Sequence, residues 1–324
     1  MDIKNYKDSL QKLKQSIKLF DANIADIEAI ELKKMFDSVY DSGLLDITHL
    51  DKKTQDKYKL ELFTMLSNIS GTLAFLVIQI LAANNIMAKN NYHKKQHYLQ
   101  KKCGIAINHL RAPITIVSGK KVDGGYILNG ILNWASGYQI FDTLLIGFHY
   151  EGFELEAMAD FVQKDNFHIQ ITPDTFVGFG LNTVNIELRD FFVADEDIVS
   201  KQNLGNYTKV KSASKTVHFC LYGLGVSAFD NTNDEDFKQI GLDKLEKIKD
   251  KFMDSNDINK LDNLRVELFC LVQDIVTTAM ILNGGKSVLS NQHLQRIYRE
   301  LIMFNSNGLN NTLKDMFKQR FLDV

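Results

Sequence analysis

Proline is nearly absent from this chain of 324 residues, and both prolines, Pro113 and Pro173, fall in its middle third. Proline is disfavoured inside helices because it has no backbone N–H group and clashes with the preceding turn. The two outer thirds are therefore free to form long helices. The middle third is where we expect a different kind of structure.

Cysteine is also scarce: the chain has three, Cys103, Cys220 and Cys270, and they lie far apart in the sequence. The paired spacings that hold zinc or carry redox chemistry are missing. The eight histidines are equally scattered, so we expect no metal site. A sparse and odd cysteine count suits a reducing compartment, and we expect a cytoplasmic protein.

An excess of charge of either sign is lacking as well, because 38 Lys and Arg stand against 40 Asp and Glu, a net charge of -2. This balance argues against nucleic acid and anionic membranes as partners. The longest apolar run, residues 73–83, is shorter than the roughly 18 residues that a membrane span needs. Residues 1–15 are too charged for a secretory signal. We expect a globular protein with no membrane partner.

Helical periodicity dominates both outer thirds. Apolar residues three and four apart predict a helix over 24–40, which Ser42 and Gly43 end, and another over 57–70. Residues 71–90 are apolar on nearly every side and predict a helix inside a bundle. Further helices are predicted over 215–229, 265–285, 293–304 and 310–322, and the charged segment 234–264 is predicted as a solvated helix or loop.

The middle third has short β-rich runs instead. Residues 114–130 contain two such runs around Asp123-Gly124-Gly125, which predicts a hairpin. Further strands are predicted over 143–148, 168–172, 184–188 and 191–194. Their spacing favours an antiparallel β-barrel or sandwich.

The order of these elements predicts an α+β chain of three domains. They are an N-terminal helical bundle (1–102), a middle antiparallel β-barrel or sandwich (103–200) and a C-terminal four-helix bundle (201–324).

The chain has one tryptophan, Trp134, which follows the run Gly125-Tyr-Ile-Leu-Asn-Gly130 and precedes Ala-Ser136-Gly137. This stretch resembles the acyl-CoA dehydrogenase family of flavoproteins, where Gly-Tyr-x-Leu-Asn-Gly leads to Trp-Ile-Thr-Gly. The resemblance implies that the chain binds FAD, with Trp134 as a wall of the flavin pocket and Ser136 as a polar contact to the reactive end of the ring. From the residues alone, Trp134 could equally be a core aromatic and Ser136 a turn serine.

Two further stretches resemble the same family. Residues 103–113, CGIAINHLRAP, match the segment that opens its β domain. This match implies that Ala106 and Asn108 line the cofactor pocket, and that His109 faces the substrate or donates a proton.

Residues 284–301 match its Gly-Gly and Arg-x-x-Arg element. The match implies that Gly284 and Gly285 approach the cofactor of a neighbouring subunit in a homodimer or homotetramer. The alternatives are that the glycines only end a helix, and that Arg296 and Arg299 only tie the bundle together.

The glutamate base of the family is not visible in this sequence. Asn307 stands at one of its two usual positions and Lys215 at the other. Asparagine cannot take up a proton at neutral pH. We therefore name His218 beside His109 as a catalytic residue that could replace the base.

The resemblance as a whole implies an FAD-dependent oxidoreductase that desaturates an acyl-CoA or another acyl thioester at its α,β position. An electron-transfer flavoprotein would be its partner. Two alternatives stay open. One is a flavin-dependent monooxygenase of the same fold, which uses reduced flavin and oxygen and needs no such glutamate. The other is a non-catalytic member that acts as a binding or assembly protein.

Overall fold

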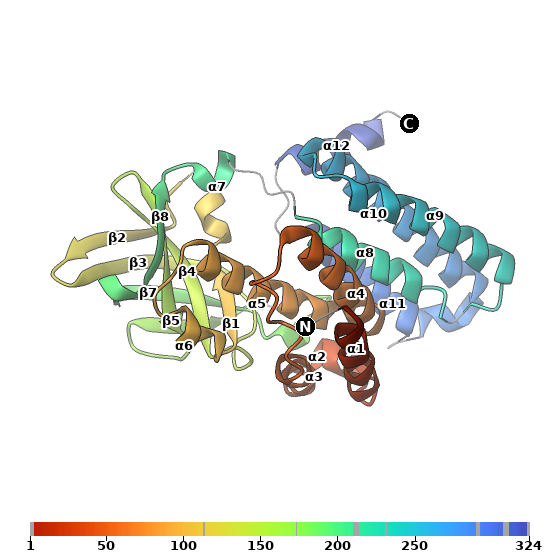
Figure 1. The fold of residues 1–324 in the computed structure, drawn as a ribbon, viewed down its shortest axis with the longest axis horizontal. Helices are drawn as coiled ribbons and strands as arrows, with labels where there is room; N and C mark the ends of the chain where they lie inside the picture. The colour runs from red at the N-terminus through yellow and green to blue at the C-terminus, as the bar shows by residue number, and fades with distance from the viewer. Residues whose placement is uncertain are drawn as a thin grey trace. The chain divides into compact units, whose positions relative to one another are not determined.

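The computed structural model describes residues 3–112, 114–172, 174–209, 214–230, 232–289, 292–306 and 311–322. These residues form twelve α-helices and eight β-strands (Figure 1). They divide into two compact units. The described residues of Met1–Phe75, Phe176–Gly178 and Ser212–Val324 form a helical unit, and those of Leu76–Thr175 and Phe179–Lys211 form a unit built around the β-sheet. The predicted three-domain division at 102 and 200 stays a prediction.

The helical unit contains most of the helices. Their bounds are α1 Ile3–Ile17, α2 Ala22–Ile27, α3 Ala29–Asp41, α4 Lys52–Ile69, α8 Thr216–Ser227, α9 Glu235–Asp254, α10 Ile258–Leu282, α11 His293–Ser306 and α12 Asn311–Leu322. Helix α8 packs against α4, α9, α10 and α11. A glycine on α8 allows a close approach to α4, because a Cβ at Gly223 would lie 2.8 Å from the backbone oxygen of Thr64.

Two of the predicted helices have different bounds. The helix predicted over 24–40 is interrupted at Glu28, whose extended backbone (φ −107°, ψ 116°) separates α2 from α3. The charged segment 234–264 is helical, but it belongs to two helices. Asp234 caps α9 by accepting from the Phe237 N–H group at 2.9 Å, and Asp257 caps α10 by accepting from Lys260 at the same distance.

Helix α5 (Gly71–Lys89) begins in the helical unit and continues into the β unit. By length and composition alone it could cross a membrane, but 67% of its apolar window is buried inside the protein. Around its second half, Ala83 and Met87 pack with Cys103, Leu145 and Met158. The predicted burial of residues 71–90 is confirmed, but the second half of the helix packs on the sheet and not inside a helical bundle.

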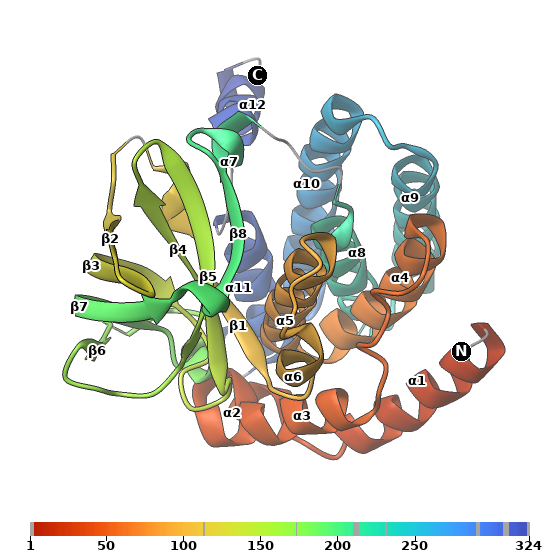
Figure 2. The ribbon, with the colours of Figure 1, turned by 60° about the vertical axis from the view of Figure 1, so that its left-hand side comes forward.

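The β unit is built on one eight-stranded sheet. Its strands are β1 Cys103–Ala106, β2 Val117–Val122, β3 Gly125–Ala135, β4 Thr143–Tyr150, β5 Phe153–Asp160, β6 Phe167–Ile171, β7 Val184–Ala194 and β8 Ile198–Asn203. The order is β6-β7-β3-β2-β4-β5-β8, with β1 beside β4. Figure 2 shows β2, β3, β7 and β6 in succession on one side of this unit. The short helices α6 (Lys95–Leu99) and α7 (Asn206–Lys209) accompany the sheet.

The prediction of an entirely antiparallel sheet was wrong at two pairings. Strand β1 pairs with β4 in parallel, and β2 pairs with β4 in parallel at Ser118 and His149. The reason is that β3 runs antiparallel to β2 and the chain then reverses direction again into β4. Strand β4 therefore runs in the same direction as β1 and β2. The predicted hairpin is confirmed, since Asp123 and Gly124 join β2 to β3 and Gly124 has φ +71°.

Strand bounds also differ from those predicted. The runs 184–188 and 191–194 form the single strand β7, because a register shift at Arg189 and Asp190 lets the strand continue. Asp190 (φ +49°) donates its N–H group to the side chain of Asn129 at 2.9 Å. Strands β1, β5 and β8 were not predicted as strands.

Candidate functional site

The segment around Trp134 is a β-bulge. Leu132 pairs with Ile186 and Ala135 pairs with Val184, so Asn133 and Trp134 together face the single residue Asn185. The side-chain oxygen of Asn185 accepts the Trp134 N–H group at 3.1 Å. The extra residue gives Trp134 a left-handed backbone with φ +60°. A bulge of this kind re-aims a side chain away from the regular alternation of the strand.

The consequence is that Trp134 is 62% exposed. A left-handed backbone at a bulky residue costs about 1–3 kcal/mol and persists only where the surroundings hold it. The interpretation of Trp134 as a core aromatic is therefore wrong. A strained backbone that presents a large aromatic ring to solvent is typical of a ligand-contacting position.

Two residues after Trp134, Ser136 lies at the end of the bulged strand and is only 6% exposed. Its hydroxyl oxygen lies 2.8 Å from that of Thr183, and either hydroxyl can be the donor. Gly137 (φ +89°) then turns the chain, and its N–H group donates to Leu181 at 2.7 Å. A hydroxyl pair has two hydrogens and uses one between its members, so one hydrogen remains for a third group.

The segment 103–113 brings its predicted residues into different environments. Ala106 lies at the end of β1 and is 7% exposed, whereas Asn108 is exposed and accepts from the Arg111 guanidinium at 2.9 Å. His109 lies on a short 3-10 helix (Asn108–Arg111), and its Nε2 is 2.9 Å from the backbone oxygen of Gly147. Burial lowers the pKa of His109 to about 4, so the ring is neutral near pH 7.

His218 belongs to the helical unit, on α8, and is 3% exposed. Its Nε2 lies 2.8 Å from the backbone oxygen of Leu261, while its Nδ1 is buried with no hydrogen-bond partner. Burial among these helices lowers its pKa to about 4. The predicted catalytic roles of His109 and His218 stay predictions, and the neutral rings offer Nδ1 as an acceptor.

The two positions that align with the family's base do not provide a carboxylate in the described structure. The ammonium of Lys215, 4% exposed, donates to the backbone oxygen of Met253 at 2.7 Å and lies 3.6 Å from Asp56. These two contacts hold the side chain as a hydrogen-bond donor. Asn307 lies outside the described residues.

Gly284 and Gly285 begin a 3-10 helix (Gly284–Val288) after α10, and both are exposed. A Cβ at either position would meet no atom within 4 Å, so no contact inside the described chain requires glycine's lack of a side chain there. Gly284 does have a positive φ of +64°. The cofactor role of these glycines stays a prediction.

Arg296 and Arg299 on the following helix make structural contacts, as the alternative interpretation of these two residues predicted. On α11, Arg296 is 3% exposed and its Nη1 lies 3.0 Å from Oε1 of the fully buried Glu300. Arg299 donates to Asp26 on α2 at 3.0 Å, and Asp26 also accepts from Thr72 at 2.8 Å. The resulting network fixes α2, α11 and the first turn of α5 inside the helical unit.

Three features of the β unit were missed by sequence reasoning. Asn185 and Thr183 position the bulge and Ser136, but they lie about 50 residues from them in the chain. The third feature is a cavity of about 490 Å³ between β2 and the β4–β5 turn, which His149 lines. Only the register of distant strands brings these residues together, so no local signal could have located them.

No protein-family model and no curated protein sequence matches the chain. Solved structures do match it over nearly its whole length. Nitrososynthase from Micromonospora carbonacea var. africana superposes with a TM-score of 0.77 at 11% identity, over 99% of this chain and 96% of that one. Butyryl-CoA dehydrogenase from Megasphaera elsdenii gives 0.72 at 13% identity over 98% of both chains.

The chain has the acyl-CoA dehydrogenase fold. XiaF from Streptomyces sp., solved in complex with FADH2 and glycerol, also has a TM-score of 0.69 to it, at 12% identity over 99% of this chain and 97% of that one. The predicted family resemblance is thus confirmed at the level of the fold. Because dehydrogenases and hydroxylating enzymes share this acyl-CoA dehydrogenase fold, the fold leaves the reaction open.

Proposed function

We propose that the protein is an FAD-dependent oxidoreductase and that its flavin ring stacks on Trp134. The observation that carries the proposal is the bulge at Trp134, where a residue that is 62% exposed has a left-handed backbone. An exposed aromatic ring lacks the stabilisation that burial of its apolar surface would give, and the left-handed backbone is itself strained. A planar apolar ring on the indole would recover the burial.

The residues next to Trp134 fit a flavin. The Ser136–Thr183 hydroxyl pair retains one hydrogen for an acceptor outside the pair, as the polar edge of a flavin ring requires. Bound FAD would supply the electron acceptance that no protein side chain provides. The chain's own residues would bind the ring through Trp134, orient its polar edge through Ser136 and position both through Asn185 and Thr183.

The first choice of substrate is a small acyl thioester such as an acyl-CoA, which would be desaturated at its α,β position. The dehydrogenases that share this fold support this substrate class. In such a reaction a base takes the proton from the α carbon, and we assign this role to His109, which lies in the same unit as Trp134 and is neutral near pH 7 with an accepting Nδ1. An electron-transfer flavoprotein would then accept the electrons.

A second function, oxygen-dependent hydroxylation with reduced flavin, is favoured by Lys215. Its ammonium donates to the backbone oxygen of Met253 and is not a base. Hydroxylation of this kind does not require a carboxylate at that position. The hydroxylase and monooxygenase neighbours with this fold support this alternative.

We further propose a homodimer or homotetramer that uses the surface around Gly284 and Gly285. Large apolar side chains are exposed there, including Ile281 (77%), Val288 (82%) and Leu289 (57%). Such a cluster on the end of α10 is typical of a subunit interface. Two backbone-accessible glycines beside it would allow a close approach by the neighbouring subunit.

The first experiment measures flavin binding by visible absorption and by tryptophan fluorescence. Since Trp134 is the only tryptophan, quenching of the emission by added FAD reports on this position alone. We expect a flavin band that stays with the protein through gel filtration, together with quenching. Trp134→Ala should lose the band, whereas Phe192→Ala, an exposed aromatic on β7, should retain it.

Flavin retained equally by both variants would disprove the pocket-wall assignment. With bound flavin, anaerobic bleaching by acyl thioesters identifies the dehydrogenase, and product formation only with reduced flavin and oxygen identifies the monooxygenase. No flavin binding by the wild-type protein would favour the remaining possibility, a non-catalytic binding or assembly protein.

A further inference from the structure

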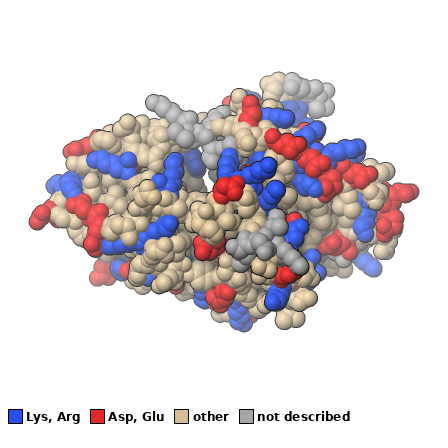
Figure 3. Space-filling model, in the orientation of Figure 1, with Lys and Arg blue, Asp and Glu red and all other residues tan. Residues whose placement is uncertain are grey.

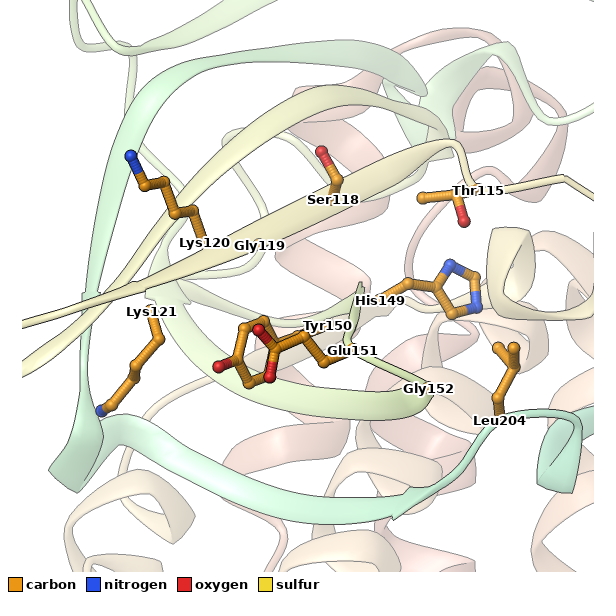
Figure 4. A pocket seen from close by; sticks show the side chains of 10 residues that line it. All are labelled: Thr115, Ser118, Gly119, Lys120, Lys121, His149, Tyr150, Glu151, Gly152 and Leu204. Atoms are coloured by element: carbon orange, nitrogen blue, oxygen red, sulfur yellow. The ribbon is translucent and has the colours of Figure 1, made fainter.

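A second site in the β unit is the cavity of about 490 Å³ between β2 and the β4–β5 turn (Figure 4). Its volume lies in the range of about 300–1,000 Å³ that is usual for small-molecule sites. Its lining residues are Thr115, Ser118, Gly119, Lys120, Lys121, His149, Tyr150, Glu151, Gly152 and Leu204. Trp134 is not among them, so the cavity is separate from the proposed flavin-stacking position.

The backbone of the sheet creates this cavity. Strands β2 and β4 pair in parallel at Ser118 and His149, with no further register pair along the described part of these strands. The β4–β5 hairpin then ends in a tight turn at Glu151 (φ +42°) and Gly152 (φ +82°). The short turn leaves the space above β2 uncovered.

His149 is the polar group at one end of the cavity. Figure 4 shows its ring between the side chains of Thr115 and Leu204. The residue is 9% exposed, and its Nδ1 is buried with no hydrogen-bond partner among the described residues. An unsatisfied buried polar group destabilises the folded protein. A buried imidazole nitrogen left unpaired beside an open cavity therefore indicates a bound polar group.

The other end of the cavity is basic. Ser118 and Lys120 are two residues apart on β2 and lie on the same face of the strand. Lys120 is exposed and has no ion-pair partner within 4 Å in the described part of the chain. Lys121 pairs with Asp195, so among the lysines that line the described cavity Lys120 is the one whose ammonium is open to a ligand, while the Glu151 carboxylate lies farther along the same lining. Figure 4 shows Lys120 at the end away from His149.

We propose that this cavity binds an elongated small organic acid, with its carboxylate or phosphate at Lys120 and a second polar group at His149. The cation supplies charge attraction for one end, and the imidazole nitrogen supplies a directional hydrogen bond for the other. This site goes beyond the flavin proposal and does not depend on it.

Ligand-observed NMR on the full-length protein tests the site with four matched probes. ω-Hydroxyhexanoate carries both groups, hexanoate lacks the hydroxyl group and hexanediol lacks the charge. ω-Hydroxyhexyl phosphate replaces the carboxylate by a phosphate, and the tighter of the two acids identifies the anionic group. We expect saturable binding of the probes that carry both groups, at least about tenfold tighter than that of hexanediol, because hexanediol lacks the charge that Lys120 attracts.

Single substitutions test the two ends of the cavity separately. Lys120→Ala should weaken ω-hydroxyhexanoate about tenfold and leave hexanediol unchanged. His149→Phe replaces the unpaired polar ring by an apolar one, and it should weaken ω-hydroxyhexanoate and leave hexanoate unchanged. Lys164→Ala is the control, since Lys164 is an exposed lysine of the same unit that pairs with Asp160.

The proposal is overturned if no acid probe binds, or if Lys120→Ala binds ω-hydroxyhexanoate as tightly as the control does. Because Lys120 is exposed, this variant remains informative even if His149→Phe fails to fold. Flavin absorption recorded on the same samples separates the two proposals: loss of the acid site with retained flavin contradicts only the present one.

Discussion

The Nη1 atom of Arg296 lies 3.0 Å from one carboxylate oxygen of Glu300 and 3.2 Å from the other, and both side chains are almost entirely buried. The two residues are one turn apart on α11. Arg296 also donates to Asn23 at 3.0 Å, and the Glu300 carboxylate accepts the Thr72 N–H group at 3.3 Å. A charge pair buried this deeply has no water to replace a missing partner.

Removal of Arg296 should therefore strongly destabilise the helical unit. Arg296→Met leaves the Glu300 carboxylate buried and unpaired, and we expect the free energy of unfolding to fall by about 3–5 kcal/mol. The double variant Arg296→Met/Glu300→Leu should recover most of the loss. Urea unfolding followed by circular dichroism measures both changes.

The matched control is an exposed pair at the same helical spacing. Lys33 and Asp37 are 2.7 Å apart on α3 with 41% and 31% exposed side chains. Lys33→Ala should cost less than about 1 kcal/mol. Equal losses for Arg296→Met and Lys33→Ala would contradict the role given to burial.

Gly71 should not tolerate a side chain. A Cβ there would lie 2.9 Å from the carboxylate carbon of Glu300, so Gly71→Ala would push that carboxylate away from Arg296. We expect a loss of roughly 1–3 kcal/mol, in the range of overpacked core sites. Gly285→Ala meets no atom within 4 Å and should leave the melting temperature unchanged.

The same control also probes the cofactor role of Gly285. If a neighbouring subunit's cofactor approaches this backbone, Gly285→Ala should lower FAD retention while the melting temperature stays constant. Unchanged retention would count against that role.

His218 should make the protein sensitive to acid. Burial lowers its pKa from 6.5 to about 4, so in the folded state it stays neutral where the unfolded chain takes up a proton. Its contribution to stability is present above pH 6.5 and is lost as the pH falls from 6.5 to about 4, roughly 3 kcal/mol in total. His218→Gln should lower the number of protons that the chain takes up on unfolding by about one in this pH range.

His109 has a pKa lowered to the same value and should contribute with the same sign. The measurement is the slope of unfolding free energy against pH for the wild type, His218→Gln and His109→Gln. An unchanged slope in both variants would show that other groups cause the acid sensitivity.

The sequence predicted most of the helices because their apolar spacing depends only on neighbouring residues. Asp123-Gly124 likewise determined the β2–β3 hairpin, since a two-residue turn with positive φ favours these residue types. Local patterns did not predict the strands whose burial depends on pairing with distant parts of the chain. Strand β5, FELEAMAD, contains the buried acids Glu154 and Glu156, which accept hydrogen bonds from Tyr207 and Ser200. Without those partners its composition does not indicate a buried strand.

The sequence by itself determined that Trp134 and Ser136 stand together at the end of a strand, and their order indicated the fold. Only the tertiary structure decided what these residues do there. Asn185 and Thr183, on and beside β7, turn Trp134 outward and pair with Ser136. The same holds for the cavity, where the parallel pairing of β2 with β4 brings Ser118 beside His149. A side chain's type follows from the sequence, but its exposure and hydrogen-bond partners depend on strand register, which distant residues set.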